Sequence, residues 1–298
     1  MNNDCETESW LPRRPSVAFV GGAIIVVMLL VCVGSLPVTL TRYADTTLAA
    51  KLEAPGGAYW MGSDALGRSV MARCLLGGAI SLGIGAAAAF ISVVIGTAWG
   101  LVAGYAGGRI DGLMMRTVDV LYGLPYILLV VLLGVALQPA LESRLGPDVG
   151  NLVTLLIAIG AVSWLTLARV VRGQVLSLRN MPFIESARAA GLPTTRILLR
   201  HVLPNLIGPV VVYATLTVPQ AILQESFLSF LGIGVRDPVP SWGNLAAAGL
   251  NELNPIKSHW WLLVWPCVLL GVTLLSLNFV GEAMRERFDP RHSQSASS

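Results

Sequence analysis

The sequence predicts an all-α membrane protein built from six transmembrane helices. Of its 298 residues, 54% are hydrophobic and only 12% are charged, and the mean hydropathy is +0.70. No soluble core of this size needs so much apolar surface, so the composition is typical of a polytopic membrane protein. The net charge of +3 is too small to indicate nucleic-acid binding.

Six largely apolar runs are long enough to cross a membrane, because about 20 helical residues span the hydrocarbon layer. They lie at residues 17–36, 79–105, 113–137, 152–168, 206–233 and 260–281. Each run must be helical, since hydrocarbon holds no water to pair with peptide groups. We expect helix even where proline interrupts the hydrogen bonds, at Pro125, Pro209, Pro219 and Pro266.

The first run has a second interpretation as a secretory signal, because Arg13 and Arg14 precede it. It is longer than the apolar part of such a signal, and no convincing cleavage site follows, so we expect an uncleaved helix. The predicted organisation is a cytoplasmic tail at 1–16, the first transmembrane helix at 17–36 and an outer loop at 37–78. A transmembrane core at 79–281 and a cytoplasmic tail at 282–298 complete it.

The distribution of basic residues predicts the orientation. With an even number of spans, thirteen of the 20 Lys and Arg residues fall on the side of the termini. The positive-inside rule therefore places both termini, and the polar segment at 182–204, in the cytoplasm. The outer loop opposes the rule with four basic residues, which Asp45, Glu53 and Asp64 accompany.

Small residues recur every four positions in the second run, at Ala88, Ser92, Gly96, Gly100 and Gly104. Such a stripe lets another helix backbone approach closely. We interpret it as a packing surface.

No catalytic, cofactor or metal site is evident. The three histidines form no ligand pair, the four cysteines have no metal-ligand spacing, and no serine lies in a GxSxG motif. Neither lysine, Lys51 or Lys257, ends a nucleotide-binding GxxxxGK[ST] loop. If transport uses ATP, another chain must hydrolyse it.

Two acidic residues within the predicted spans are candidates for a pathway or gating role, because ionisable groups in a membrane are expensive. For Asp119, a local ion pair with Arg116 one helical turn earlier is a sufficient explanation. Glu225 lies well inside an apolar run beside Gln224. A pathway role and an interhelical hydrogen bond both remain open for it.

The polar segment at 182–204 predicts two short helices. Pro182 starts the first, in which Ile184, Ala187 and Ala190 share a face, and Gly191 offers the conformation that ends it. After Pro193, Thr194 or Thr195 caps the second helix, which Pro204 breaks.

Two uses of this segment fit its composition. Small residues near Ser186 and Ala187 let a protein partner come close, while Arg188, Arg196 and Arg200 offer bidentate contacts to carboxylates. Alternatively, the segment is an amphipathic loop whose arginines face lipid phosphates.

At these residues a family resemblance becomes specific. Glu185, Ala187, Gly191, Leu203 and Pro204 match E-A-A-x3-G-x9-I-x-L-P, the EAA motif of permeases from binding-protein-dependent ABC importers. Ser186 and His201 depart from it. Arg200 to Asn205 is similar to the dipeptide, oligopeptide and nickel branch, as are residues 61–85, 107–119, 223–235, 240–245 and 288–291. Residues 61–85 depart from the common form of this branch at Ser69, Ala72 and residues 78–80.

The resemblance covers residues 61–291, and the chain is similar to the second, C-type permease of such transporters. It implies the type I ABC importer permease fold, no enzyme activity, and location in the bacterial inner membrane. The implied partners are a second homologous permease, two cytoplasmic ABC ATPases and an external solute-binding protein, besides membrane lipid. It further implies that Glu185, Ala187, Arg188 and Gly191 dock the ATPase, with the second short helix linking them to the fifth span.

By the same resemblance, the expected solute is a dipeptide or oligopeptide, with nickel or another small solute as an alternative. An ion-coupled secondary transporter using Asp119 and Glu225 is a hypothesis from another class. It predicts internal inverted repeats, and the sequence displays none. A scaffold without transport would leave the EAA motif unexplained.

Overall fold

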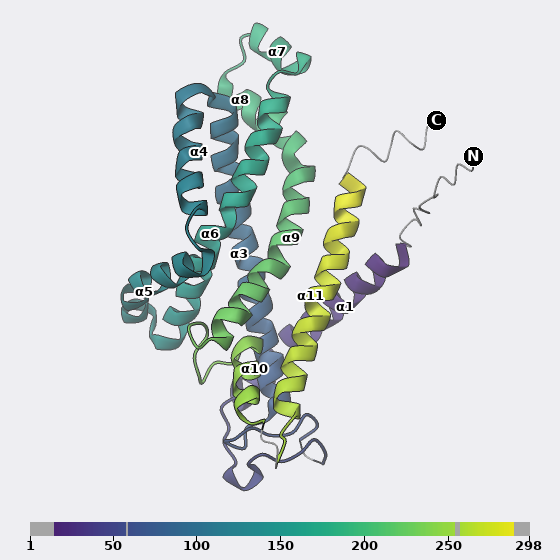
Figure 1. Cartoon of the computed structure of the whole chain (residues 1–298). Coiled ribbons are helices and arrows are strands. Elements are labelled where there is room, and N and C mark those ends of the chain that lie inside the picture. The colour runs from purple at the N-terminus through teal and green to yellow at the C-terminus, as the bar shows by residue number, and fades with distance from the viewer. Residues whose placement is uncertain (1–14, 58, 254–256, 289–298) are drawn as a thin grey trace, which may run out of the picture.

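The computed structural model describes residues 15–57, 59–253 and 257–288, and this part of the chain is all-α apart from isolated bridges. The helices run largely along one axis (Figure 1). Arg13, Arg14 and all of the predicted motif at 288–291 beyond Phe288 lie outside the described residues.

The order of elements begins with α1 (Pro15–Gly34), α2 (Leu36–Arg42), the 3₁₀ turn η1 (Leu48–Ala50), α3 (Val70–Ala106), α4 (Gly108–Tyr122), α5 (Tyr126–Leu145) and α6 (Pro147–Leu178). It continues with α7 (Pro182–Ala189), α8 (Thr194–Ile197), the π-helical turn η2 (Leu198–Val202), α9 (Leu203–Phe230), α10 (Trp242–Asn251) and α11 (Trp261–Phe288).

Among the described residues, six helical segments are long and apolar enough to cross a membrane, as the sequence predicts. They are α1, α3, α5, α6, the continuous run at 194–230 and α11. At about 1.5 Å per residue, the 37-residue α3 is about 55 Å long, so it extends well beyond the hydrocarbon layer.

The predicted span at 113–137 is wrong. Helix α4 ends at Tyr122, and α5 begins after Pro125, whose φ of −56° and ψ of 122° lie outside the helical region. Proline lacks an N–H and disfavours helix in the residue before it, which separates the two helices. The spanning helix is α5, whereas α4 carries four charged residues beside α3 and α6 (Figure 1).

The centre of the molecule is the packing of α3 on α6, and the predicted stripe of small residues forms it. A Cβ at Gly100 would lie 2.5 Å from the carbonyl oxygen of Ala168, and one at Gly104 would lie 2.8 Å from Cβ of Val175. Ser92 donates a hydrogen bond of 3.0 Å to the Ser163 carbonyl. Larger side chains on α3 would force the two helices apart.

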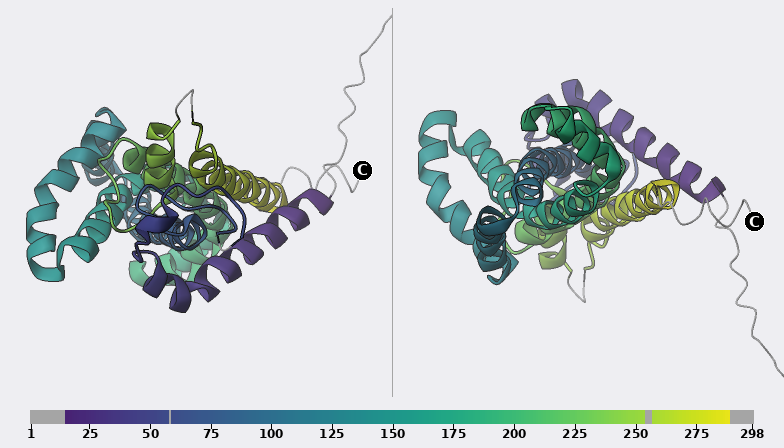
Figure 2. Two further views of the ribbon diagram at one scale, coloured as in Figure 1. Left: turned by 90° about the horizontal axis from the view of Figure 1, so that it is seen from below. Right: turned by 90° about the horizontal axis from the view of Figure 1, so that it is seen from above.

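Helices α1 and α11 lie against each other at the edge of the molecule (Figure 2). Both expose large apolar side chains, among them Phe19 and Leu30 of α1 and Leu275 of α11. The loop between α2 and α3 covers the end of the molecule opposite α7 (Figure 1). There Trp261 donates an indole hydrogen bond of 3.3 Å to the Ser63 carbonyl.

Candidate functional site

The segment from α7 to η2 projects from one end of the molecule, beyond α6 and α9 (Figure 1). As predicted, Pro182 is at the start of α7, and Gly191 ends the turn with φ at +75°. The N–H of Leu192 bonds to the Ala187 carbonyl at 3.2 Å, and that of Gly191 bonds to the Arg188 carbonyl at 2.9 Å. This pair of bonds is a Schellman motif, which requires the left-handed conformation that glycine adopts at little cost.

The segment is anchored by its apolar face. Ile184 and Ile197 are buried in one cluster with Leu101 of α3 and Val171 and Val175 of α6. Ala187 is also buried there, so its side chain packs inside this chain and is not free for a partner. Ala190, which was predicted to share that face, is exposed because α7 ends one residue earlier.

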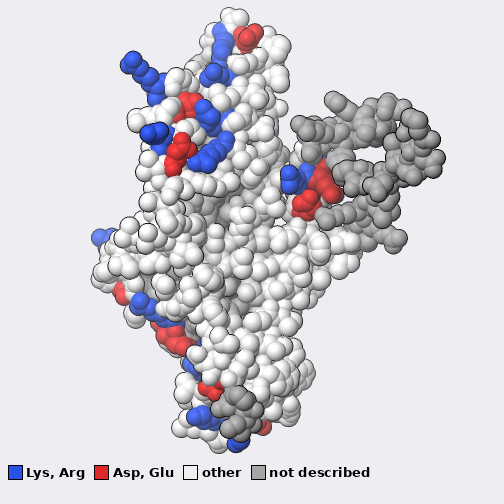
Figure 3. Space-filling model, in the orientation of Figure 1, with Lys and Arg blue, Asp and Glu red and all other residues white. Residues whose placement is uncertain are grey.

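The opposite face of the segment is polar. Glu185, Ser186, Arg188, Arg196 and Arg200 are exposed. Arg188 stacks over the Tyr105 ring, 5.2 Å from its centroid, and its Nε donates to the tyrosine hydroxyl at 3.4 Å. Arginines gather over this end of the molecule, with a few acidic residues among them, above a broad surface without charge (Figure 3).

Two local predictions for the second short helix are wrong. Pro193 occupies the N-cap position of α8, and neither Thr194 nor Thr195 caps it by a side-chain hydrogen bond. Pro204 does not break the helix: it lies in the first turn of α9, directly after the π-helical turn η2, where the Leu203 N–H bonds to the Leu198 carbonyl. The helix therefore continues without a break from Thr194 to Phe230.

Asp119 does not pair with Arg116. Its Oδ1 accepts a bond of 2.9 Å from Arg169 of α6, and the Arg169 guanidinium stacks 4.1 Å above the Tyr122 ring. The prediction failed because the partner is distant in sequence, and because Asp119 belongs to α4 and not to a spanning helix.

A second ion pair joins α4 to α6, between Asp111 and Arg172. The guanidinium donates from Nε and an Nη to the two carboxylate oxygens, each at 2.6 Å. These bonds lower the pKa of Asp111 below its ordinary 3.8, although burial opposes them. The pair fixes α4 against the body near the α7 segment.

Glu225 is fully buried, and serine hydroxyls surround its carboxylate. Ser81 of α3 and Ser229 of α9 each donate at 2.7 Å, and Ser226 is 3.3 Å away. These contacts support the interhelical hydrogen bond, one of the two roles left open by the sequence. Glu225 does not line the cavity described next.

A cavity of about 410 Å³ opens between the turn after α4, the middle of α6 and α9. Its polar lining includes Tyr126, whose hydroxyl donates to the Gln224 side chain across the cavity. Sequence reasoning missed these residues. The available signal was the helical spacing of Tyr213, Thr217, Gln220 and Gln224 within an apolar span.

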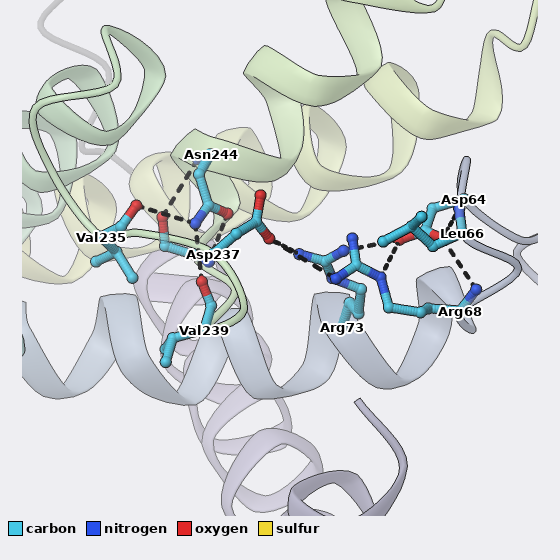
Figure 4. Close-up of polar contacts among 9 residues, drawn as sticks. Asp64, Leu66, Arg68, Arg73, Val235, Asp237, Val239 and Asn244 are labelled. Atoms are coloured by element: carbon cyan, nitrogen blue, oxygen red, sulfur yellow. Dashed lines mark hydrogen bonds and ion pairs between the residues drawn. The ribbon is translucent and has the colours of Figure 1, made fainter. Parts of the chain in front are cut away.

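At the other end of the molecule, Arg73 joins two segments that are far apart in sequence (Figure 4). Its two terminal nitrogens bond at 2.7 Å to Asp64, before α3, and to Asp237, after α9. Arg73 and Asp64 are 4% and 14% exposed, whereas Asp237 is 67% exposed. Asn244 closes the neighbouring loop by donating to the carbonyls of Val235 and Val239 (Figure 4).

Asp64 also pairs with Arg68, at 2.6 Å. Burial alone would raise the pKa of Asp64, but bonds from the Arg68 main chain and side chain and from the Leu66 N–H outweigh it. The pKa therefore lies below its ordinary 3.8. Ser69, one of the departures from the resembled motif, caps α3 by accepting a bond from the Ala72 N–H at 3.4 Å.

Comparison with known proteins assigns the chain to a family. Residues 96–294 match the family described as binding-protein-dependent transport system inner membrane component. The oligopeptide transport system permease protein OppC of Haemophilus influenzae is 42% identical, over 90% of this chain and 82% of the relative. The dipeptide transport system permease protein DppC of Bacillus subtilis is 43% identical, over 80% and 70%.

A further relative, OppC of Escherichia coli K12, is 41% identical over 95% of this chain and 89% of its own length. Among solved structures, a chain of the inward-facing MetNI methionine ABC transporter matches with a TM-score of 0.55. At 19% identity, over 74% of this chain and 97% of that one, this match shows a common fold. The family model and the relatives show that the chain belongs to the binding-protein-dependent transport system inner membrane components, the permease subunits of ABC importers.

Proposed function

We propose that this chain is the C-type permease of an ATP-driven importer that moves dipeptides or oligopeptides across the bacterial inner membrane. An external solute-binding protein delivers the peptide, and this chain and a second, homologous permease form the path. The relatives named above support the solute class, since each is an oligopeptide or dipeptide permease at 41% to 43% identity.

The proposal for energy coupling rests on how the α7 segment is attached to the rest of the molecule. Ile184 and Ile197 anchor the segment in the body, while Glu185, Arg188 and Arg196 face outward. A groove of a cytoplasmic ABC ATPase can receive this polar face, and the exposed Ser186 allows close approach. Because the helix is continuous from Thr194 to Phe230, movement of the docked segment acts directly on α9.

The proposed orientation has the α7 end and both termini in the cytoplasm. Basic residues of α4, α6 and the α7 segment gather at this end (Figure 3), among them Arg109, Arg169, Arg179, Arg196 and Arg200. The positive-inside rule favours the cytoplasm for short segments of this kind. The exposed apolar faces of α1 and α11 suit contact with membrane lipid. In the proposed complex, each of the two permeases docks one of the two ATPases.

The structure gives less support to an ion-coupled secondary transporter. Such a carrier needs an acidic group that exchanges its ion with a pathway. Asp119 is neutralised by Arg169, and Glu225 is sealed among serines outside the cavity. For nickel import, the residues that the structure describes include no group of three or more metal-ligating side chains.

Uptake by the reconstituted complex tests the solute. Proteoliposomes should contain this chain, its companion permease and the two ATPases, with the solute-binding protein added outside. We expect labelled tripeptide to accumulate with ATP and not with an ATPase variant that binds ATP without hydrolysing it. ATP-dependent uptake of nickel without any peptide uptake would overturn the proposed solute.

A charge reversal tests the docking segment. Glu185→Lys should weaken ATPase binding about fivefold at low salt and less at high salt, as expected for an exposed charge. Glu286→Lys makes the same change at an exposed position of α11 and should leave binding unchanged. Equal binding by both variants and the parent would show that the α7 segment does not dock the ATPase.

A further inference from the structure

The cavity beside α9 contains chemistry that the proposed transport function does not explain. Its volume of about 410 Å³ lies in the range of ligand sites, roughly 300 to 1,000 Å³. Most of its walls come from α5, α6 and α9, which cross the membrane, and the end of α4 with the turn after it completes them. Ser163 lies near the middle of α6. The cavity is therefore within the membrane region and away from the α7 segment.

The polar groups on its walls are arranged in two rows. On α9, Thr217, Gln220 and Gln224 follow each other at spacings of three and four, so they share one face. On α6, Ser163 and Thr166 do the same. Tyrosines add hydroxyls at Tyr122, Tyr126 and Tyr213.

All of these groups are neutral and can both donate and accept hydrogen bonds, as amide and hydroxyl groups do. A peptide main chain presents the same pattern, one N–H donor and one C=O acceptor at each residue other than proline. Gln220 is exposed, and the Gln224 side-chain oxygen accepts a hydrogen bond from the Tyr126 hydroxyl across the cavity. The lining can thus replace water around peptide groups.

The cavity also lacks fixed charge on its walls. Within the described part of the chain, its lining residues include no Asp, Glu, Lys, Arg or His. At the Tyr122 wall, the Arg169 guanidinium stacks on the tyrosine ring, and its ion pair with Asp119 offsets its charge. A charged side chain on a passing solute meets neither a fixed opposite charge nor a fixed like charge.

We propose that this cavity is a subsite for the main chain of an extended peptide, which it binds through amide and hydroxyl groups without selecting side-chain charge. The inference rests on the proposed peptide import and adds a property of the path itself. Gln220 and Gln224 are the central contacts. The Tyr126–Gln224 hydrogen bond opens when a peptide group replaces one of its partners.

Placing a charge in the cavity tests the inference. The tripeptides Ala-Glu-Ala, Ala-Ala-Ala and Ala-Lys-Ala are compared in proteoliposomes, each at a concentration that saturates the solute-binding protein. Wild-type uptake should differ little among the three. Gln220→Glu should slow Ala-Glu-Ala relative to the uncharged Ala-Ala-Ala by about fivefold, the effect of ~1 kcal/mol between like charges near 4 Å apart in water, and it should not slow Ala-Lys-Ala. Gln220→Lys should reverse the order.

The matched controls are Gln174→Glu and Gln174→Lys, at an exposed position of α6 that does not line the cavity. They should leave the order of the three peptides unchanged. A second variant tests the main-chain contact: Gln224→Leu should slow uptake of Ala-Ala-Ala about fivefold. It should have less effect on the analogue with an N-methylated central peptide bond.

The outcomes separate this inference from the proposed function. Peptide uptake by the wild-type complex, with no change in peptide order in either Gln220 variant, overturns the subsite and leaves peptide import intact. Absence of peptide uptake by the assembled wild-type complex overturns both. ATPase co-purification and basal ATP hydrolysis are measured for every variant, and unchanged values show that the complex is assembled.

Discussion

Gln224 and Glu225 are adjacent in α9 but face different surroundings. Gln224 lines the cavity and bonds to Tyr126, whereas the fully buried carboxylate of Glu225 accepts hydrogen bonds from Ser81 and Ser229. Adjacent side chains of a helix point in different directions, so the neutral side chain reaches the cavity and the acidic one lies between packed helices. The more polar residue type is not the one that reaches the cavity.

The packing role of Glu225 predicts that its charge is dispensable but its hydrogen-bonding capacity is not. Glu225→Gln keeps one oxygen to accept from Ser229 and places an NH₂ group where it can donate to the Ser81 hydroxyl, so we expect it to assemble and transport normally. Glu225→Ala leaves Ser81 and Ser229 without their partner, so it should lower stability by about 1–3 kcal/mol. Unfolding in detergent and peptide uptake check both variants. Loss of uptake in a stable Glu225→Gln protein would favour a pathway role instead.

Gly191 predicts a specific effect on coupling, and the chain offers a matched control. Gly191 and Gly232 end α7 and α9 with the same Schellman bonds, have φ of +75° and +79°, and leave open space around an added Cβ. Replacement by valine should cost each about 1–2 kcal/mol of backbone strain. Only Gly191→Val should lower ATP hydrolysis coupled to uptake. Equal loss in both variants would indicate general destabilisation.

The two carboxylates that Arg73 joins should differ in their contribution to stability. Asp64 is largely buried and serves two arginines, so Asp64→Asn breaks a buried pair and should cost about 3 kcal/mol. Asp237 is mostly exposed, and Asp237→Asn should cost less than about 1 kcal/mol. Chemical unfolding of the purified chain measures both. Equal costs would contradict the assignment of Asp64 as the central acceptor.

The ion pair of Asp111 and Arg172 predicts a pH dependence of stability. Because the folded pKa of Asp111 lies below 3.8, the pair stabilises the protein fully above that pH. This contribution should be lost as the pH falls from 3.8 through the lower folded pKa. Unfolding midpoints of the parent and Asp111→Asn should therefore differ near neutral pH and converge in acid. Asp148→Asn, at an exposed position of α6, should change the unfolding midpoint little at any pH.

Much of the fold is predictable from the sequence because its signals are local. Apolar length determines which segments span a membrane, and the four-residue repeat of small side chains determines the surface that α3 presents to α6. Gly191 and Pro182 mark the limits of α7 through backbone properties that need no tertiary partner. The same short-range reasoning fails at Pro204, since a proline can either end a helix or occupy its first turn.

The partners of polar groups were not predictable in this way. Arg116 was the nearest basic residue to Asp119 in sequence, but Arg169, 50 residues later, holds the ion pair. The break between α4 and α5 comes from Pro125, but the place of α4 beside α6 involves two ion pairs between residues that are 50 or more positions apart.

The sequence by itself determined the membrane class, the number of spans, the α7 turn and, through its motifs, the family resemblance. Only the tertiary structure decided that Ala187 is buried, that Glu225 packs among serines, and that Gln224 lines a cavity. The physical reason is that composition and helical period act along the chain. By contrast, burial and hydrogen-bond partners depend on which helices meet, and α3, α6 and α9 meet only in the folded protein.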